Sequence, residues 1–342
     1  MDAIRSVHDL PTPALVVERE ALEHNLDAMA RALPGARLRP HVKAHKCTAI
    51  AALQRARGHA GFTCATVREM EGLARAGLGD DLLLANEVVD ARQMRRLGAL
   101  VEAGARVTVA IDSPQTIDAA VRGGVREAVV DVNVGMPRCG CAPGAAGALA
   151  DAARRAGLSV RGVMGYEGHA VGIDDRARRE ELCAASMALL AAAHADVGGE
   201  LVSAGGTGTF DCNGVATEIQ AGSYALMDTA YGKLDLPFRQ ALFGLATVVS
   251  VAPGDAWAVL DFGLKGLGMD HGNPQVAGAK VWFCSDEHTT LAADGREPAF
   301  AIGERVRLVP AHVDPTVAYH EALWLVDGER VLDRFEVDLR GW

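Results

Sequence analysis

Residues 81–132 contain three short apolar runs, DLLLA at 81–85, VTVAI at 107–111 and AVVDV at 128–132. Alanine-rich segments with apolar residues at helical spacing lie between these runs. Short apolar runs, often with β-branched residues, are typical of buried strands, and their alternation with helices predicts a parallel sheet. This part of the chain therefore indicates an α/β fold.

The same alternation extends outward from residues 81–132 in both directions. The expected strands are 38–42, 61–65, 81–85, 107–111, 128–132, 160–166, 200–203 and 218–221, and expected helices include 18–33, 67–76, 91–103, 115–122, 145–156 and 177–194. Eight such units over roughly 200 residues predict a (β/α)₈ TIM barrel across 18–230, with a doubly wound open sheet as the alternative. The link between the last two strands is short and weakly helical.

Beyond about residue 231 the helical period is nearly lost. Expected strands are 246–251, 256–260, 275–283, 305–310, 322–326 and 329–335, joined by turns rich in Gly, Pro and Asp. This pattern predicts a C-terminal antiparallel β domain. The strand candidate 12–17 lies outside the barrel alternation, so we expect residues 1–17 to join residues 231–342 in that domain.

Composition and charge exclude several classes of protein. The 342 residues carry a formal net charge of −10, which offers no basic footprint for nucleic acid. The seven cysteines lack paired spacing, as expected of reduced thiols. Residues 1–11 lack the apolar core of a signal peptide, and no apolar run reaches the length of a membrane span. We therefore expect a soluble cytoplasmic protein.

The octapeptide RPHVKAHK, residues 39–46, follows the start of the first expected strand. Active sites of barrels lie at the carboxyl ends of the strands, where this segment places Lys43, His45 and Lys46. A lysine there could hold an aldehyde cofactor as a Schiff base, because neighbouring cations would lower the pKa of its amine. A basic surface loop is the alternative.

Glycines follow the last two expected strands, as Gly205-Gly206 before Thr207 and as Gly222 before Ser223. Backbone N–H groups and hydroxyls in these places can bind a phosphate. A tight turn is the alternative for the first pair. A phosphate at these loops and a lysine on the first strand together suggest pyridoxal 5′-phosphate.

In the β domain, His312 and Asp314 stand two residues apart. If this stretch is extended, both side chains point to one face. An imidazole and a carboxylate suit a divalent metal, with water or substrate completing the coordination. A hydrogen-bonded His–Asp pair in a turn is the alternative.

Six motifs carry a resemblance to a known family. They are PHVKAHK (40–46), VGMPRCG (134–140), GYEGH (165–169), SAGGT (203–207), QAGSY (220–224) and HVDPT (312–316). With these motifs in this order, the chain resembles the fold-type III pyridoxal-phosphate enzymes, which are alanine racemase-like barrels. More narrowly it resembles the D-threonine aldolases and the related D-serine dehydratases.

The resemblance implies roles for the cofactor-side residues. Lys43 is expected to be the Schiff-base lysine, with Lys46 in support, and Arg138 to lie near the phenolic oxygen of the cofactor. Gln220 stands where alanine racemases carry an arginine that faces the pyridine nitrogen. The other implied cofactor residues are Gly206, Thr207, Gly222, Ser223 and Tyr224 in the phosphate cup, and Tyr166 and His169 beside the ring.

The resemblance also implies a reaction. D-serine dehydratases carry cysteine where Asp314 stands here, and a carboxylate better suits Mn²⁺ or Mg²⁺. This favours a D-threonine aldolase, a carbon–carbon lyase of D-amino acid metabolism that cleaves D-3-hydroxy-amino acids to glycine and an aldehyde. His169 is the first candidate base and His45 the second.

Alternatives on this scaffold are a dehydratase of the D-serine or D-3-hydroxyaspartate type and an amino-acid racemase. A non-catalytic cofactor-binding barrel is a third. Gln220 and the pair of His312 and Asp314 argue against a racemase. The resemblance further implies a homodimer. The segment Gly268-Met-Asp270-His271-Gly departs from the family pattern, and we expect it to alter the substrate pocket.

Overall fold

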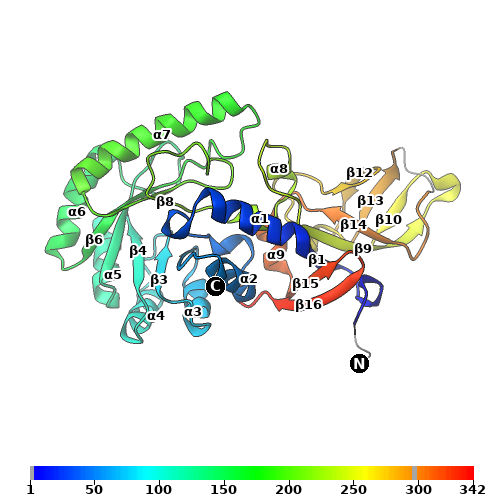
Figure 1. Ribbon diagram of the computed structural model, residues 1–342, viewed down its shortest axis with the longest axis horizontal. Helices are drawn as coiled ribbons and strands as arrows, with labels where there is room; N and C mark the ends of the chain where they lie inside the picture. Colours follow the sequence, from blue (N-terminus) through cyan, green and yellow to red (C-terminus); the bar gives the residue numbers. More distant parts are fainter. Residues whose placement is uncertain (1–3, 295–298) are drawn as a thin grey trace. The chain divides into compact units, whose positions relative to one another are not determined.

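The computed structural model describes residues 4–294 and 299–342 (Figure 1). The undescribed residues fall within the predicted ranges 1–17 and 231–342. The chain forms two compact units. The barrel unit comprises Met29–Lys43, Ile50–Gly222 and Leu339–Trp342, and the β unit comprises Met1–Ala28, Ala44–Ala49 and Ser223–Asp338. The predicted division between residues 230 and 231 stays a prediction.

The barrel unit contains the expected parallel sheet. Its strands follow the chain order β2 (Gly61–Cys64), β3 (Asp81–Leu84), β4 (Val107–Ile111), β5 (Glu127–Asp131), β6 (Ser159–Gly165), β7 (Leu201–Ala204) and β8 (Glu218–Ile219). Every neighbouring pair is parallel. The strands are buried and rich in β-branched residues, so seven of the eight predicted strands are confirmed, each within one or two residues at its ends.

The first predicted strand, 38–42, is not a regular strand. It nevertheless bonds to both outer strands of the sheet: the Arg39 N–H donates to Ile219 O (2.9 Å), and the Thr63 N–H donates to Pro40 O (2.9 Å). Pro40 has no N–H of its own, which limits regular pairing. Because it connects β8 to β2, this segment closes the barrel.

The predicted helices of the barrel are confirmed as α3 (Val67–Arg75), α4 (Ala91–Glu102), α5 (Pro114–Gly123), α6 (Ala146–Arg155) and α7 (Arg176–Val197), which pack against the strands (Figure 1). Side-chain caps fix several starts; Thr66, for example, accepts the Glu69 N–H while the Glu69 carboxylate accepts the Thr66 N–H. Among the described residues no helix joins β7 to β8, in line with the weak pattern there.

The remaining helical elements lie in other parts of the chain. The α-helices are α1 (Arg19–Ala32), α2 (Thr48–Ala56), α8 (Thr229–Gly232) and α9 (Val313–Tyr319), and the short 3₁₀ helices are η1 (Val7–Asp9), η2 (Gly35–Arg37), η3 (Val42–Ala44), η4 (Pro143–Ala145), η5 (Ser223–Ala225), η6 (Pro253–Asp255) and η7 (Leu264–Gly266). The sequence predicted α1 but neither α2 nor α9. In the described part of the chain, no helix is both long and apolar enough to cross a membrane.

The β unit is built on a nine-stranded sheet in the order β10-β13-β12-β11-β14-β9-β1-β15-β16. The strands are β1 (Ala14–Glu18), β9 (Leu242–Val251), β10 (Ala258–Leu260), β11 (Gln275–Val276), β12 (Ala279–Cys284), β13 (Thr289–Ala293), β14 (Arg305–Val309), β15 (Ala322–Asp327) and β16 (Arg330–Glu336). β10 also pairs with β9, so six strands form a closed antiparallel barrel. β1 joins β9 and β15, which confirms the expected contribution of the N-terminal strand.

Buried ion pairs lie at the amino ends of the parallel strands. Asp81, the first residue of β3, accepts hydrogen bonds from Arg39 (2.8 Å) and from Arg161 (2.8 Å). Glu218, the first residue of β8, accepts from Arg39 Nε at 2.8 Å. Burial alone would raise the pKa of the Asp81 carboxyl, but the hydrogen bonds from Arg161 and Arg39 lower it to about 2. The charged network thus leaves the carboxyl ends available for a site.

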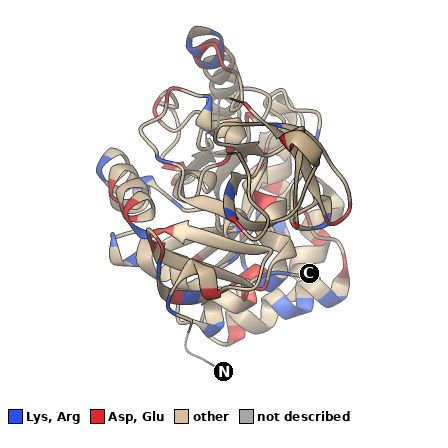
Figure 2. Ribbon diagram, turned by 90° about the vertical axis from the view of Figure 1, so that its right-hand side faces the viewer, with Lys and Arg blue, Asp and Glu red and all other residues tan. Residues whose placement is uncertain are grey.

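Charged residues of both signs are interspersed along the helices (Figure 2). This distribution agrees with the formal net charge of −10, which gives the chain no overall basic character.

The substitution Asp81→Asn tests the ion-pair network. We expect it to lower the free energy of unfolding by about 3 kcal/mol at pH 7, because it breaks a buried pair and leaves two guanidinium groups without their shared carboxylate. The folded pKa lies below the unfolded value of about 3.9, so the stabilisation is present above that pH and is lost as the pH falls toward 2.

The difference between the free energies of unfolding of parent and Asp81→Asn, measured with urea, should therefore become smaller as the pH falls from about 4 to about 2. Asp118→Asn, which removes an exposed partner of Arg122, is the matched control and should change stability little. A difference in free energy of unfolding that stays the same at all pH values would contradict the role of Asp81.

Candidate active site

Lys43 lies where the closing segment of the barrel ends, in η3, and its side chain is partly buried. Lys46 belongs to the β unit and has a positive φ of 45°, an uncommon backbone conformation for a residue other than glycine. His45 is fully buried, and its Nδ1 accepts the Cys47 N–H at 3.2 Å. The two lysines of the octapeptide are therefore not equivalent.

Three predicted residues come from the loops after β5 and β6. The Arg138 guanidinium carbon lies 5.2 Å from the centre of the Tyr166 ring, a cation–π contact. His169 packs on Gly135, since a Cβ at Gly135 would lie 3.1 Å from His169 Cε1. Buried His169 Nδ1 has no hydrogen-bond partner in the described structure. This imidazole nitrogen therefore has an unused capacity to form a hydrogen bond.

The glycine loop after β7 is held by Glu167, whose side chain is fully buried. Its carboxylate accepts from Thr209 Oγ1 (2.7 Å), from the Gly205 N–H (3.2 Å) and from Asn213 Nδ2 (3.4 Å). Thr209 Oγ1 in turn accepts the Gly206 N–H at 3.2 Å. Glu167 stands within the GYEGH motif, but its role could not be predicted from the sequence because its partners lie about 40 residues away along the chain.

The backbone conformation at Gly205 and the close packing at Gly222 favour glycine, whereas Gly206 has room for a Cβ with small shifts of its neighbours. Gly205 has φ +83°, a conformation that favours glycine. A Cβ at Gly206 would lie 3.4 Å from Tyr166 Cε2, and a Cβ at Gly222 would lie 2.4 Å from His41 O. A tight turn and a cradle for a phosphate are both compatible with this packing, and Thr207 lies buried in the same loop.

Gln220 follows β8 and is oriented by a chain of hydrogen bonds. Its Nε2 donates to Ser203 Oγ (2.8 Å), and Ser203 Oγ donates to the Glu218 carboxylate (2.7 Å). Because a carboxylate only accepts, the direction of this chain is fixed. Gln220 therefore keeps its carbonyl oxygen available as an acceptor.

Asp131 and Glu87 form a pair of neighbouring carboxyl groups close to Arg138. Burial and the neighbouring Glu87 carboxylate together raise the pKa of the Asp131 carboxyl to about 8, although the Arg138 guanidinium acts to lower it. Asp131 and Arg138 line one small cavity together with Asn133, Met136, Cys139 and Tyr166. The pair can hold a proton near neutral pH at the carboxyl ends of the strands.

In the β unit, His312 is the N-cap residue of α9 and Asp314 lies in its first turn. The chain is therefore helical at Asp314, and the conditional expectation of an extended conformation is wrong. The two side chains are not brought to one face by the alternation of a strand. Their Nε2 and Oδ2 atoms nevertheless lie 3.7 Å apart. That distance is too long for a hydrogen bond, which excludes the alternative of a directly bonded pair.

Two further predicted residues, Ser223 and Tyr224, belong to the β unit. Ser223 Oγ donates to Asp314 Oδ2 at 3.4 Å. Tyr224 is fully buried, and its ring centre lies 5.6 Å from that of Phe238. Ser223 thus contacts the candidate metal ligands within this unit, whereas Gly206, Thr207 and Gly222 belong to the barrel unit.

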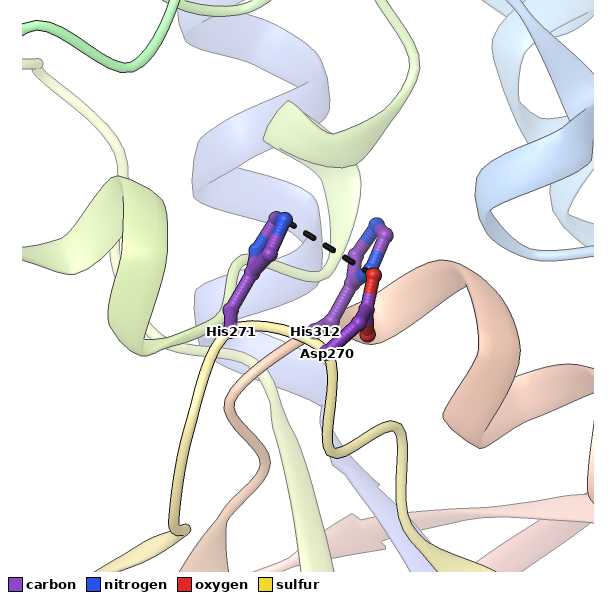
Figure 3. Close-up of side chains that lie close together, drawn as sticks. All are labelled: Asp270, His271 and His312. Carbon is purple, nitrogen blue, oxygen red and sulfur yellow. Dashed lines mark hydrogen bonds and ion pairs between the residues drawn. The ribbon is translucent and has the colours of Figure 1, made fainter.

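Asp270 and His271 join His312, as Figure 3 shows. The Asp270 carboxylate lies 2.7 Å from His312 Nδ1, and the His271 ring stacks on the His312 ring with centres 4.2 Å apart. Imidazoles and carboxylates are donors that bind divalent metals. Asp270 and His271 belong to the segment that departs from the family pattern, and an Asp-His pair next to a glycine is the sequence signal for these two residues.

Two family models match the chain. One, described as "Alanine racemase, N-terminal domain", matches residues 17–229, and one described as "Putative serine dehydratase domain" matches residues 241–326. The first match covers the barrel strands and their loops, and the second covers most strands of the β unit.

Curated relatives and solved structures agree with these matches. D-threonine aldolase from an Arthrobacter species is 36% identical, with 97% of this chain and 93% of the relative covered. 3-hydroxy-D-aspartate aldolase from Paracoccus denitrificans is 34% identical, with the same coverage of 97% and 93%.

The crystal structure of D-threonine aldolase from Filomicrobium marinum superposes with a TM-score of 0.92 at 35% identity, covering 100% of this chain and 99% of that one. D-threo-3-hydroxyaspartate dehydratase from a Delftia species superposes with a TM-score of 0.88 at 26% identity, covering 98% and 100%. The chain therefore belongs to the alanine racemase-like barrel family, within the group that contains D-threonine aldolase and 3-hydroxy-D-aspartate aldolase.

Proposed function

We propose that the protein is a lyase that uses pyridoxal 5′-phosphate and a divalent metal to cleave D-3-hydroxy-amino acids to glycine and an aldehyde. The observation that carries the proposal is the pair His312 and Asp314, with Nε2 and Oδ2 3.7 Å apart. This distance suits two ligands of one cation. The similarity to two named aldolases along nearly the whole chain supports it.

The residues of the barrel unit fit the cofactor. Lys43 would hold its aldehyde, and the loops that contain Gly206, Thr207 and Gly222 would hold its phosphate. Glycine at Gly206 keeps open a space beside the Tyr166 ring that a Cβ would fill. When bound, pyridoxal phosphate supplies an electron sink for the carbanion that remains after the carbon–carbon bond breaks.

Other side chains would orient the ring of the cofactor. Arg138 lies over the ring of Tyr166 and would donate a hydrogen bond to the phenolic oxygen of the cofactor. Gln220 would face the ring nitrogen, with its amide held in place by the hydrogen bond from Nε2 to Ser203. Ser223 and Tyr224, which belong to the β unit, are the other residues proposed to bind the phosphate.

His169 is the proposed base for the hydroxyl proton of the substrate. Its Nδ1 is buried and has no partner in the described residues, so it can accept a proton from a bound molecule. His45 ranks second, because it is fully buried and its Nδ1 already accepts the Cys47 N–H.

His312 and Asp314 are the proposed metal ligands. A metal there would lower the pKa of a coordinated hydroxyl, which is the chemistry that retro-aldol cleavage requires. The carboxylate of Asp314 is a hard oxygen donor, so we propose Mn²⁺ or Mg²⁺ as the metal. We also propose a homodimer, as the family resemblance implies.

A dehydratase is the second candidate, because the serine dehydratase model matches residues 241–326 and D-threo-3-hydroxyaspartate dehydratase is 28% identical. The alanine racemase structures are 12% identical and share the fold alone. Asp314 distinguishes this chain from the dehydratase pattern, which carries cysteine at that place.

The first test is product analysis of D-threonine and D-3-hydroxyaspartate, with and without a chelator. We expect glycine and an aldehyde when Mn²⁺ is present, and loss of more than 90% of the rate (roughly tenfold or more) after chelation, because the hydroxyl then keeps its high pKa. Formation of a keto acid and ammonia would instead identify a dehydratase. Full activity after chelation would exclude the proposed role of the metal.

The second test compares the lysines of the octapeptide. We expect Lys43→Ala to lose the visible absorption band of the bound cofactor and its sensitivity to borohydride, because the covalent bond is absent. Lys46→Ala should keep both. Absorption spectra of the two purified variants with added pyridoxal phosphate measure the difference, and a band that survives in Lys43→Ala would move the Schiff base elsewhere.

The third test concerns Glu167, which holds the glycine loop in place. Glu167→Gln should weaken pyridoxal phosphate binding about 5- to 100-fold, because the amide cannot accept from all of the buried donors and leaves some of them unpaired. Equilibrium dialysis gives the affinity, and thermal unfolding of the cofactor-free variant measures any loss of stability separately. Glu180→Gln, on the exposed side of α7, is the control. Equal affinities for the two variants would argue against the role of Glu167.

A further inference from the structure

We propose that Asp270 is a positioning residue of the metal centre and acts through His312. This inference deepens the proposed function and rests on its assignment of His312 and Asp314 as ligands. Asp270 itself does not bind the metal. Its carboxylate sets the tautomer and the orientation of the His312 imidazole, so that Nε2 faces Asp314.

A short hydrogen bond joins Asp270 to His312. Asp270 Oδ2 lies 2.7 Å from His312 Nδ1 (Figure 3). An ionised carboxylate can only accept, so the proton must sit on Nδ1. The neutral ring then carries its lone pair on Nε2, the nitrogen that lies 3.7 Å from Asp314 Oδ2. A metal-binding histidine commonly donates its other N–H to a carboxylate in this way.

The distances between the side-chain atoms distinguish a hydrogen bond from two ligands of one metal ion. Neighbouring ligands of an octahedral ion, with bonds of about 2.1 Å, lie about 3.0 Å apart, and ligands of a tetrahedral ion lie farther apart. The 2.7 Å between Asp270 and His312 is shorter than either and matches a charge-assisted hydrogen bond. The 3.7 Å between His312 and Asp314 is long enough for an ion to bind both.

Contacts between the loop at Gly268 and the start of α9 hold Asp270 in place. The loop before it pairs with the start of α9 through an isolated bridge between Gly268 and His312. The Gly268 N–H donates to Thr316 Oγ1 (2.9 Å), which donates to His312 O (2.7 Å). A Cβ at Gly268 would lie 2.4 Å from Pro315, so this approach depends on glycine. The position of Asp270 relative to His312 is therefore built into the backbone.

His271 adds a packing contact. Its ring is nearly parallel to that of His312, with an angle of 7° between the planes. This stacking covers one face of His312 and limits rotation of its ring. Asp270, His271 and His312 could alternatively hold an ion by themselves, on the Nδ1 side of His312. That arrangement would make His271 a ligand, whereas in the proposed arrangement His271 stacks on His312 and lies beside the Asp270 carboxylate, with Nε2 3.8 Å from Oδ2.

The experiment measures Mn²⁺ affinity of the full-length protein loaded with pyridoxal phosphate, by isothermal titration calorimetry. We expect Asp270→Asn to weaken binding about 10- to 100-fold, the usual cost of losing such an outer partner, and His271→Ala to weaken it less. His312→Ala and Asp314→Ala should abolish measurable binding. Asp286→Asn, an exposed carboxylate paired with Lys265, removes the same charge elsewhere in the β unit and should bind as the parent does.

Nitrogen-15 NMR of the metal-free protein gives a second readout that a merely structural role would not move. We expect His312 to be the Nδ1–H tautomer in the parent and to lose that preference in Asp270→Asn. Parental affinity or an unchanged tautomer in Asp270→Asn would overturn the inference while leaving the proposed function intact. If His271→Ala lost as much Mn²⁺ affinity as His312→Ala, the inference would be overturned in favour of an ion held by Asp270, His271 and His312. A parent that binds no Mn²⁺ would overturn both proposals.

Discussion

The hydrogen bonds of residues 38–41 to β8 and β2 are the constraint on which the barrel unit depends. Without them the seven parallel strands would form an open sheet, and the segment that ends at Lys43 would have no fixed place. Pro40 keeps this segment from becoming a full strand, so the chain turns into η3 directly after it closes the barrel. Closure of the fold and presentation of the candidate cofactor lysine thus depend on the same few residues.

The barrel also separates two kinds of polar chemistry along its axis. Arg39, Arg161 and Asp81 form a buried, fully paired network at the amino ends of the strands. The carboxyl ends carry side chains such as Gln220 and His169, which keep an atom available for a ligand. A paired network tolerates burial, whereas a group with a free acceptor is useful only where a ligand can reach it.

The sequence predicted the parallel strands well, because buried runs such as 107–111 carry a local signal of β-branched residues. It missed β13 and α2, whose patterns are weaker, and it left the geometry of His312 conditional on an extended chain. The roles of Glu167 and Asp270 could not be predicted, because each depends on partners about 40 residues away in the chain. The local pattern of apolar residues predicts which face of an element is buried. Which polar side chains form hydrogen bonds depends on contacts between distant parts of the chain.

The closed ring of six strands in the β unit has a consequence for solubility. A closed barrel leaves no open strand edge, so further growth of the sheet is confined to the branch formed by β1, β15 and β16. On β16 the N-terminal segment covers the start, where the Val331 N–H donates to Arg5 O at 2.9 Å. The remainder carries Asp333, Arg334 and Glu336. Covering and charge are the two devices by which native sheets resist pairing with a second chain, so this edge is protected against aggregation along its length.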